Sequence, residues 1–149
     1  MNRFHLRSSA FICGCIGLCL GAAAAAAVTA TDAWVRGTVP AQTSTGAFVT
    51  LKSSEDAKVV AVVTPAAKTA EIHESAVHEA MMHMHAVDSL ALPAGKRVEL
   101  KPGGFHVMLM GLVKPLVAGD VVPLTFTVED RHGKRSTFKV EAEVRPLGR

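Results

Sequence analysis

Methionine and histidine side chains gather in one stretch of this 149-residue chain. Apart from the initiator, every methionine lies between residues 81 and 110, and most histidines lie in or just before the same stretch: Met81, Met82, Met84, Met108 and Met110, with His73, His78, His83, His85 and His106. The thioether sulfur of methionine is soft and uncharged, so it favours Cu(I) over Zn²⁺, Mg²⁺ or Ca²⁺. A single methionine is usually core filler. Their concentration beside imidazoles indicates a site for a soft metal ion.

Strand geometry brings these ligands onto common faces. Alternate residues of a strand point to the same side, so His106 and Met108 lie about 6.5 Å apart along one face and can converge on one ion. Met82 and Met84 share a face in the same way, opposite the two histidines that alternate with them. His73, from the preceding strand, would complete a set of four ligands.

The elements that must position these residues are predicted to be strands. From Trp34 onward the apolar residues alternate with polar ones, and proline and glycine mark the turns. We predict strands at 33–39, 46–52, 58–63, 70–75, 81–87, 97–100, 105–112, 122–129 and 136–144. This spacing is typical of an all-β sandwich or small Greek-key barrel of about eight or nine mostly antiparallel strands.

The N-terminal segment has the pattern of a secretory signal peptide. Residues 1–7 are basic, and residues 10–28 carry no charge and end in alanines, as export signals do. We predict cleavage after Ala27, which leaves residues 28–149 as a single exported domain with no stable membrane anchor. A membrane anchor is the alternative, since 19 residues span about 28 Å as a helix. A lipoprotein signal is disfavoured because Leu18, rather than a small residue, precedes Cys19.

Removal of this leader would also remove all three cysteines, Cys13, Cys15 and Cys19. The exported domain would then have no disulfide, no thiol nucleophile, no cysteine-ligated zinc and no blue-copper centre, which requires a thiolate. Without the leader's two arginines the domain has 14 basic and 13 acidic residues. This balance argues against nucleic-acid binding, which needs a clustered cationic face.

The spacing of four residues is that of a known signature. His73, ten residues, Met84, twenty-one residues, His106, one residue and Met108 resemble the H-x10-M-x21-H-x-M signature of the periplasmic copper chaperones called the PCu(A)C family. The resemblance extends over about residues 31–145. It includes the segments Asp32-Ala-Trp-Val-Arg, Thr45-Gly-Ala-Phe, Glu71-Ile-His-Glu, Leu92-Pro-Ala-Gly and Leu100-Lys-Pro-Gly-Gly-Phe-His-Val-Met-Leu-Met-Gly-Leu.

This resemblance implies a cupredoxin-like β-barrel that binds one Cu(I) through His73, Met84, His106 and Met108. It implies a periplasmic carrier rather than an enzyme. The carrier would deliver copper by ligand exchange for assembly of the CuA site of cytochrome c oxidase, with subunit II or another periplasmic copper carrier as acceptor. Some family members carry a His/Met-rich C-terminal extension, which is absent after the last predicted strand of this chain.

Two other readings stay open on the sequence alone. A periplasmic scavenger or buffer could hold Cu(II) or Zn²⁺ through His73, His78, His83 and His85, since borderline cations accept imidazole ligands. A β-sandwich with no metal is the third reading. Taken singly, His78 and His132 are predicted to be ordinary solvated histidines.

Overall fold

The computed structural model describes residues 26–148, in which every regular element is a strand. The ten strands are β1 (Val28–Arg36), β2 (Ser44–Ser53), β3 (Ala57–Val63), β4 (Ala67–His78), β5 (Met81–Ala86), β6 (Leu90–Leu92), β7 (Arg97–Leu100), β8 (Phe105–Leu112), β9 (Val121–Asp130) and β10 (Arg135–Arg145). The predicted all-β, mostly antiparallel fold is confirmed.

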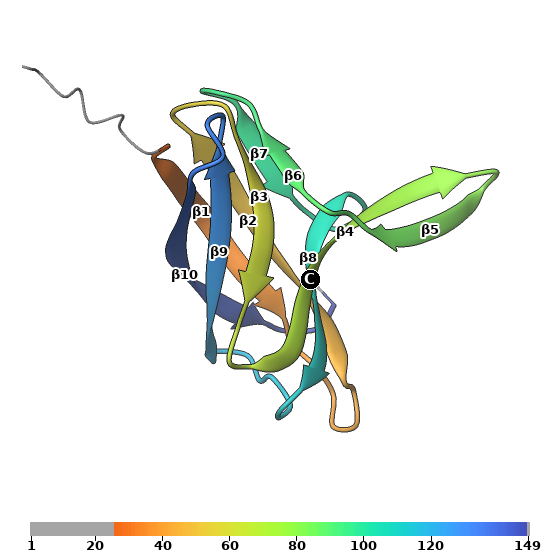
Figure 1. The fold of residues 1–149 in the computed structure, drawn as a ribbon. Coiled ribbons are helices and arrows are strands. Elements are labelled where there is room, and N and C mark those ends of the chain that lie inside the picture. The colour runs from red at the N-terminus through yellow and green to blue at the C-terminus, as the bar shows by residue number, and fades with distance from the viewer. Residues whose placement is uncertain (1–25, 149) are drawn as a thin grey trace, which may run out of the picture.

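The strands form one curled sheet (Figure 1) in the order β5-β4-β8-β2-β1-β10-β9-β3-β6, with β7 paired to β2. All the pairs are antiparallel except β1 with β10, which run parallel. The inward face supplies the core, in which the largest fully buried side chains include Leu51, Leu92, Leu109, Leu124 and Phe126. Alternation of buried and exposed residues along β9 and β10 is the pattern expected when one face of a strand is buried.

The strand predictions differ from the structure in three main places, one of which is β4, predicted at 70–75 and observed at Ala67–His78. The strand predicted at 33–39 runs from Val28 to Arg36 instead, because residues 28–31 also pair with β2. Asp32 has φ 51° and the register shifts there, which breaks the period-two pattern and hides the first half of the strand. The short β6 was not predicted, since its three residues lie directly before Pro93 in a segment with strong turn signals.

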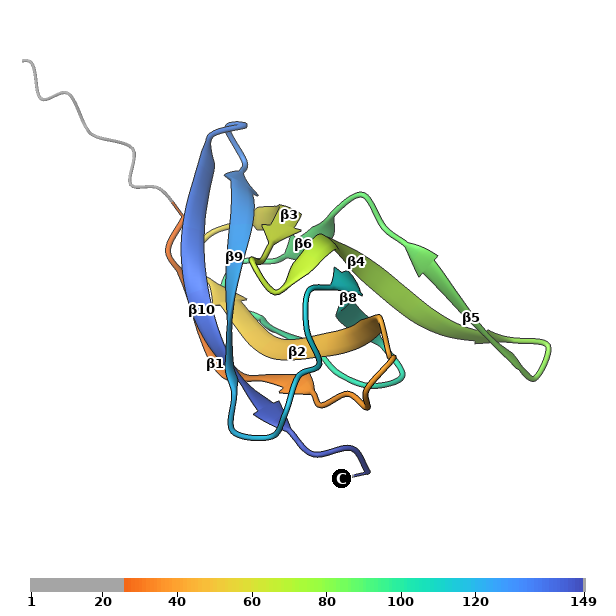
Figure 2. The ribbon, with the colours of Figure 1, turned by 90° about the horizontal axis from the view of Figure 1, so that it is seen from below.

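The outer half of β4 and the whole of β5 project from the barrel as an arm, defined here as residues 74–86 (Figures 1 and 2). Every residue of β5 is exposed. The two-residue turn at the tip places Glu79 and Ala80 at φ 49° and 62°, the left-handed region that a hairpin of this length requires. Within the arm, β5 is therefore held by its pairing with β4, and the arm has little core of its own.

Most of the predicted leader, residues 1–25, lies outside the described residues, so the leader and its cleavage after Ala27 stay predictions. Within residues 26–148 no helix has the length and apolarity needed to cross a membrane.

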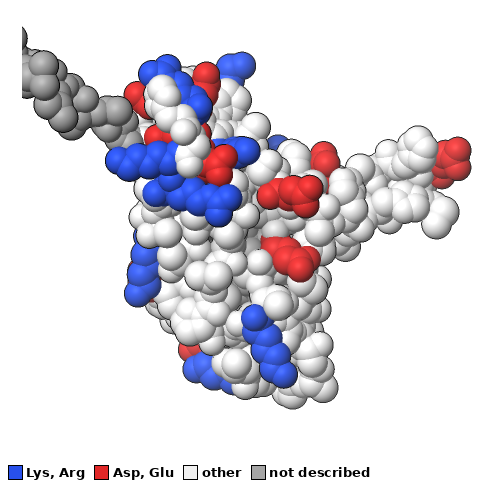
Figure 3. Space-filling model, in the orientation of Figure 1, with Lys and Arg blue, Asp and Glu red and all other residues white. Residues whose placement is uncertain are grey.

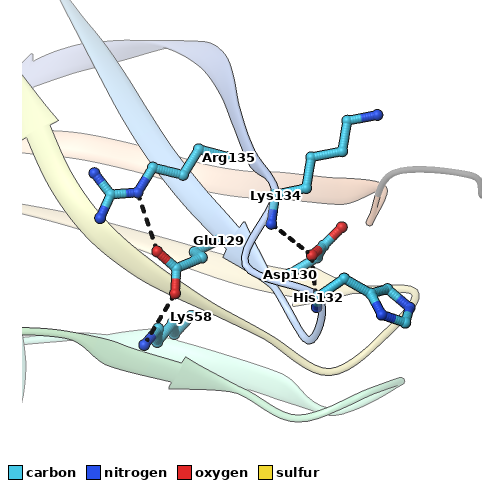
Figure 4. Close-up of polar contacts among 6 residues, drawn as sticks. All are labelled: Lys58, Glu129, Asp130, His132, Lys134 and Arg135. Atoms are coloured by element: carbon cyan, nitrogen blue, oxygen red, sulfur yellow. Dashed lines mark hydrogen bonds and ion pairs between the residues drawn. The ribbon is translucent and has the colours of Figure 1, made fainter.

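Carboxylates at the end of β9 link stability to pH (Figure 4). Hydrogen bonds from Arg135 first, and then from Lys58, hold the pKa of Glu129 below its ordinary value, at distances of 3.0 and 3.2 Å. Backbone N–H groups of Lys134 and His132 similarly lower the pKa of Asp130. A carboxyl whose pKa is lower in the folded state stabilises the fold above its unfolded pKa and loses that contribution as the pH falls through the folded pKa.

We therefore expect the melting temperature to fall as the pH drops below about 4.5, and Glu129→Gln to reduce that dependence. Thermal unfolding followed by circular dichroism from about pH 3 to about pH 7, a range that includes the ordinary carboxyl pKa of about 4, measures both. Glu143, an exposed glutamate of β10 without an ion pair in the described part of the chain, gives the matched control Glu143→Gln. An identical pH profile for the two variants would contradict the assignment.

Candidate metal centre

The four residues of the signature lie on three neighbouring strands. His73 of β4 lies directly opposite His106 of β8, and the centroids of their rings are 5.9 Å apart. Met108 lies two residues further along β8, and Met84 of β5 lies opposite the β4 residue two positions beyond His73. Opposed residues share a face and so do residues two apart on one strand. All four side chains are therefore on the same face of the sheet.

A cavity of about 310 Å³ lies on this face, where the arm meets the barrel. Met82 and Met84 line it from the arm, while His106 and Met108 line it from β8. His73 is not among the lining residues, although its ring neighbours that of His106. The predicted ligands therefore divide into three that surround the cavity and one that lies beside it.

His106 is held in an orientation suited to ligation. It is one of the few buried polar residues, with 6% of its surface exposed. Its Nδ1 lies 3.1 Å from the carbonyl oxygen of Gly104, and since a carbonyl only accepts, Nδ1 must carry the proton. The lone pair of Nε2 is then free for a metal, and such a hydrogen bond on the other ring nitrogen is typical of metal-ligating histidines.

His73 is fixed by a carboxylate. Its Nε2 lies 3.0 Å from Oε2 of Glu71, two residues earlier on the same face of β4. Because an ionised carboxylate can only accept, Nε2–H donates and Nδ1 keeps its lone pair. The arrangement leaves His73 able to ligate through Nδ1 without losing Glu71. The Glu71 carboxylate also places one negative charge beside His73, in a set of four predicted ligands that are all neutral.

The face carries residues that the strand pattern did not single out. Phe48 of β2 packs near His106, with ring centroids 6.3 Å apart, and Trp34 packs on Phe48 at 4.4 Å. Gly46, opposite Met108, leaves room for Phe48, because a Cβ at Gly46 would lie 3.0 Å from Cζ of the Phe48 ring. The only signal for Phe48 and Gly46 in the sequence was their place in the segment Thr45-Gly-Ala-Phe.

The other three methionines differ in which face they lie on and in whether they line the cavity. Met82 has the same face and nearly the same exposure as Met84, 60% against 59%. Met110 shares the face of Met108 but does not line the cavity, and Met81 lies on the opposite face of the arm. The prediction that Met82 and Met84 share one face of their strand is confirmed.

The histidines that alternate with these methionines are directed away from the cavity. His83 and His85 pair with Ala76 and Glu74 of β4, on the face opposite His73. The set of four histidines proposed for a scavenger is therefore not brought together. His132 lies in the exposed β9–β10 turn, as expected of a solvated residue. In residues 26–148 no group of three His, Cys, Asp or Glu is placed to hold a metal ion, so a site on the cavity face depends on its methionines.

Comparison with solved structures identifies the class of fold. The apo PCuAC domain from PmoF1 matches with a TM-score of 0.62 at 20% identity, covering 80% of this chain and 93% of that chain. The copper-bound PCuAC domain from PmoF2 matches with a TM-score of 0.59 at 18% identity, covering 79% and 93%. The solution structure of CuI-DR1885 from Deinococcus radiodurans matches at 34% identity with a TM-score of 0.56, covering 76% and 74%. The fold is that of PCuAC domains.

A family model described as "Putative lipoprotein LpqE-like" matches residues 28–144. The chain belongs to this LpqE-like family, and the resemblance to the PCuAC copper chaperones predicted from its sequence is confirmed. A curated relative named "Putative lipoprotein Lxx21020", from Leifsonia xyli subsp. xyli, is 34% identical over 104 residues, which is 69% of this chain. The match spans 63% of that relative's length.

Proposed function

We propose that this protein is a copper carrier that binds one Cu(I) through His73, Met84, His106 and Met108 and releases it by ligand exchange. The observation that carries the proposal is the common face that the four side chains share at the base of the arm, where Met84, His106 and Met108 line the cavity and His73 lies beside His106. Copper-loaded structures of two proteins with this fold support it.

The chemistry of the four groups favours a carrier over an enzyme. Thioether and imidazole ligands bind Cu(I) without the stronger hold of thiolates, so the ion can move to another protein's ligands. The ligands differ in their access to solvent, because His106 is buried and Met84 is 59% exposed. A copper acceptor can therefore reach the ion from the side of the arm and displace Met84 first.

The proposed place of action rests on the predicted leader and the names of the relatives, and the proposed partners rest on the resemblance to the copper chaperones. The predicted signal peptide and the lipoprotein names of the family model and the curated relative support a location outside the cytoplasm, which we assign to the periplasm. The acceptor is a copper site assembled there, and the CuA centre in subunit II of cytochrome c oxidase or another periplasmic copper carrier fits the proposal.

X-ray absorption at the copper edge tests the ligand set. The protein, isolated after export and loaded with one equivalent of Cu(I), is expected to show two sulfur and two nitrogen neighbours, because the cavity face offers both thioether and imidazole groups. Nitrogen neighbours alone would contradict the proposal and favour a histidine site. Because no cysteine lies between residues 26 and 149, any sulfur observed must come from methionine.

The Glu71 carboxylate is expected to strengthen copper binding through His73. Glu71→Ala removes the group that fixes the His73 ring, and loss of such a partner typically lowers metal affinity about 10- to 100-fold. Competition with a chromophoric Cu(I) chelator measures the change. Glu71→Gln retains an oxygen acceptor and is expected to lose less, whereas equal affinity for Glu71→Ala and the unaltered protein would show that Glu71 plays no part.

A further inference from the structure

The face of the arm opposite the cavity carries its own group of potential metal ligands. Glu74 of β4 lies directly opposite His85 of β5, and His83 is two residues from His85 on the same strand. All three side chains therefore point to one side, away from the cavity. Neither the signature nor the comparisons assign a role to this second face.

The spacing of the three residues suits a common ion. Nε2 of His85 lies 3.5 Å from Oε2 of Glu74, so two potential metal-ligating groups already lie close together. His83 and His85 are about 6.5–7 Å apart along the strand, and His83 is the diagonal neighbour of Glu74 at about 7–8 Å. A cation above the strand is within reach of all three side chains.

Only a side-chain rotation separates the observed arrangement from a complete site. In the described residues no three nitrogen or oxygen donors are yet gathered round one point. His83 belongs to a strand that is exposed along its whole length. Its imidazole can therefore change rotamer without displacing packed atoms. The backbone need not move, since the β4–β5 register already aligns the three residues.

The surrounding charge favours a cation. Between residues 69 and 95 the chain has four carboxylates, those of Glu71, Glu74, Glu79 and Asp88, and neither lysine nor arginine. Figure 3 shows no lysine or arginine on the visible surface of the arm and an acidic group at its tip. The side chains of His85 and Glu74 are 57% and 38% exposed, so an ion can reach them from solvent.

We propose that His83, His85 and Glu74 form a second copper site that binds Cu(II). Two imidazoles and a carboxylate are borderline and hard ligands, which suit Cu²⁺ far better than Cu⁺, and Cu²⁺ binds such sites more tightly than the other divalent ions of its row. The alternation of residues 82–85 then gives one strand a thioether face for Cu(I) and an imidazole face for Cu(II). This site goes beyond the proposed carrier function and does not depend on it.

Titration of the exported protein with copper(II) sulfate, followed by electron paramagnetic resonance and chelator competition, tests the site. One Cu(II) with nitrogen hyperfine splitting is expected. In the His83→Gln/His85→Gln variant the affinity should fall at least about 100-fold, because loss of even an outer-shell partner of a metal site costs 10- to 100-fold. The matched control is His132→Gln, which alters an exposed histidine of the β9–β10 turn.

The variants also separate the two sites. Met84→Leu/Met108→Leu should keep Cu(II) binding, and the double histidine variant should keep Cu(I) binding. The second site is overturned if the unaltered protein binds no Cu(II), if the double histidine variant binds it as the unaltered protein does, or if His132→Gln lowers the affinity equally. Loss of Cu(II) from the double methionine variant would place the ion in the cavity and also overturn it, while leaving the Cu(I) proposal intact.

Discussion

The Met84→Leu/Met108→Leu variant is expected to lose Cu(I) binding, with an affinity at least about 100-fold lower than that of the unaltered protein. Leucine replaces both thioethers with apolar groups of similar volume, so the fold should tolerate the change. The two imidazoles and the thioethers of Met82 and Met110 would remain on this face, and of these two methionines only Met82 lines the cavity. Met82 shares the face of Met84 but lies one step nearer the tip of the arm.

Chelator competition under anaerobic conditions measures this loss. Met81→Leu/Met110→Leu is the matched control, because it also removes two thioethers, but from positions that do not line the cavity. The control should bind as the unaltered protein does. Retention of Cu(I) by Met84→Leu/Met108→Leu would remove Met84 and Met108 from the ligand set and with them the proposed carrier site.

Phe126→Ala is expected to lower the free energy of unfolding by about 3–5 kcal/mol, the usual cost of deleting a large buried ring. Phe126 lies on β9 with none of its surface exposed, and it stacks on Phe138 of β10 with ring centroids 5.3 Å apart. The neighbouring strands are hydrogen-bonded on both sides of β9. The cavity left by the ring therefore has little freedom to collapse.

Urea denaturation followed by circular dichroism measures this change. Phe138→Ala is the companion variant and should cost less, because Phe138 is only half-buried. The folded fraction of Phe126→Ala should still bind Cu(I), since β8 is separated from β9 in the sheet by β2, β1 and β10. A loss below about 0.5 kcal/mol, within the range of ordinary surface changes, would contradict the role of Phe126 in the core.

The alternation of residue types explains why much of the fold was predictable. In β8 the buried Val107 and Leu109 alternate with His106 and Met108, so the periodicity alone separates the core face from the opposite face. The same logic placed Met82 and Met84 together. The choice of Met84 over Met82 came from the signature spacing alone. The structure does not separate the two methionines, since both line the cavity and their exposure is nearly equal.

Features set by long-range pairing were not predictable. The parallel pairing of β1 with β10 joins the two ends of the described chain, and no local pattern encodes it. The projection of the arm was also hidden, because methionine and histidine alternate along β5 without marking a buried face. The contact of His73 with Glu71, and that of His106 with Gly104, depend on side-chain orientations that spacing does not determine.

The arm has one consequence for how copper would leave the protein. His106 and Met108 belong to a strand packed over the core, whereas Met84 belongs to a segment whose residues are all exposed. If copper is held as proposed, a small bend of the hairpin would move Met84 away from the ion and leave the barrel unchanged. Under the proposed function, the stiffness of the hairpin, rather than the stability of the whole fold, would set the barrier to handing over the ion.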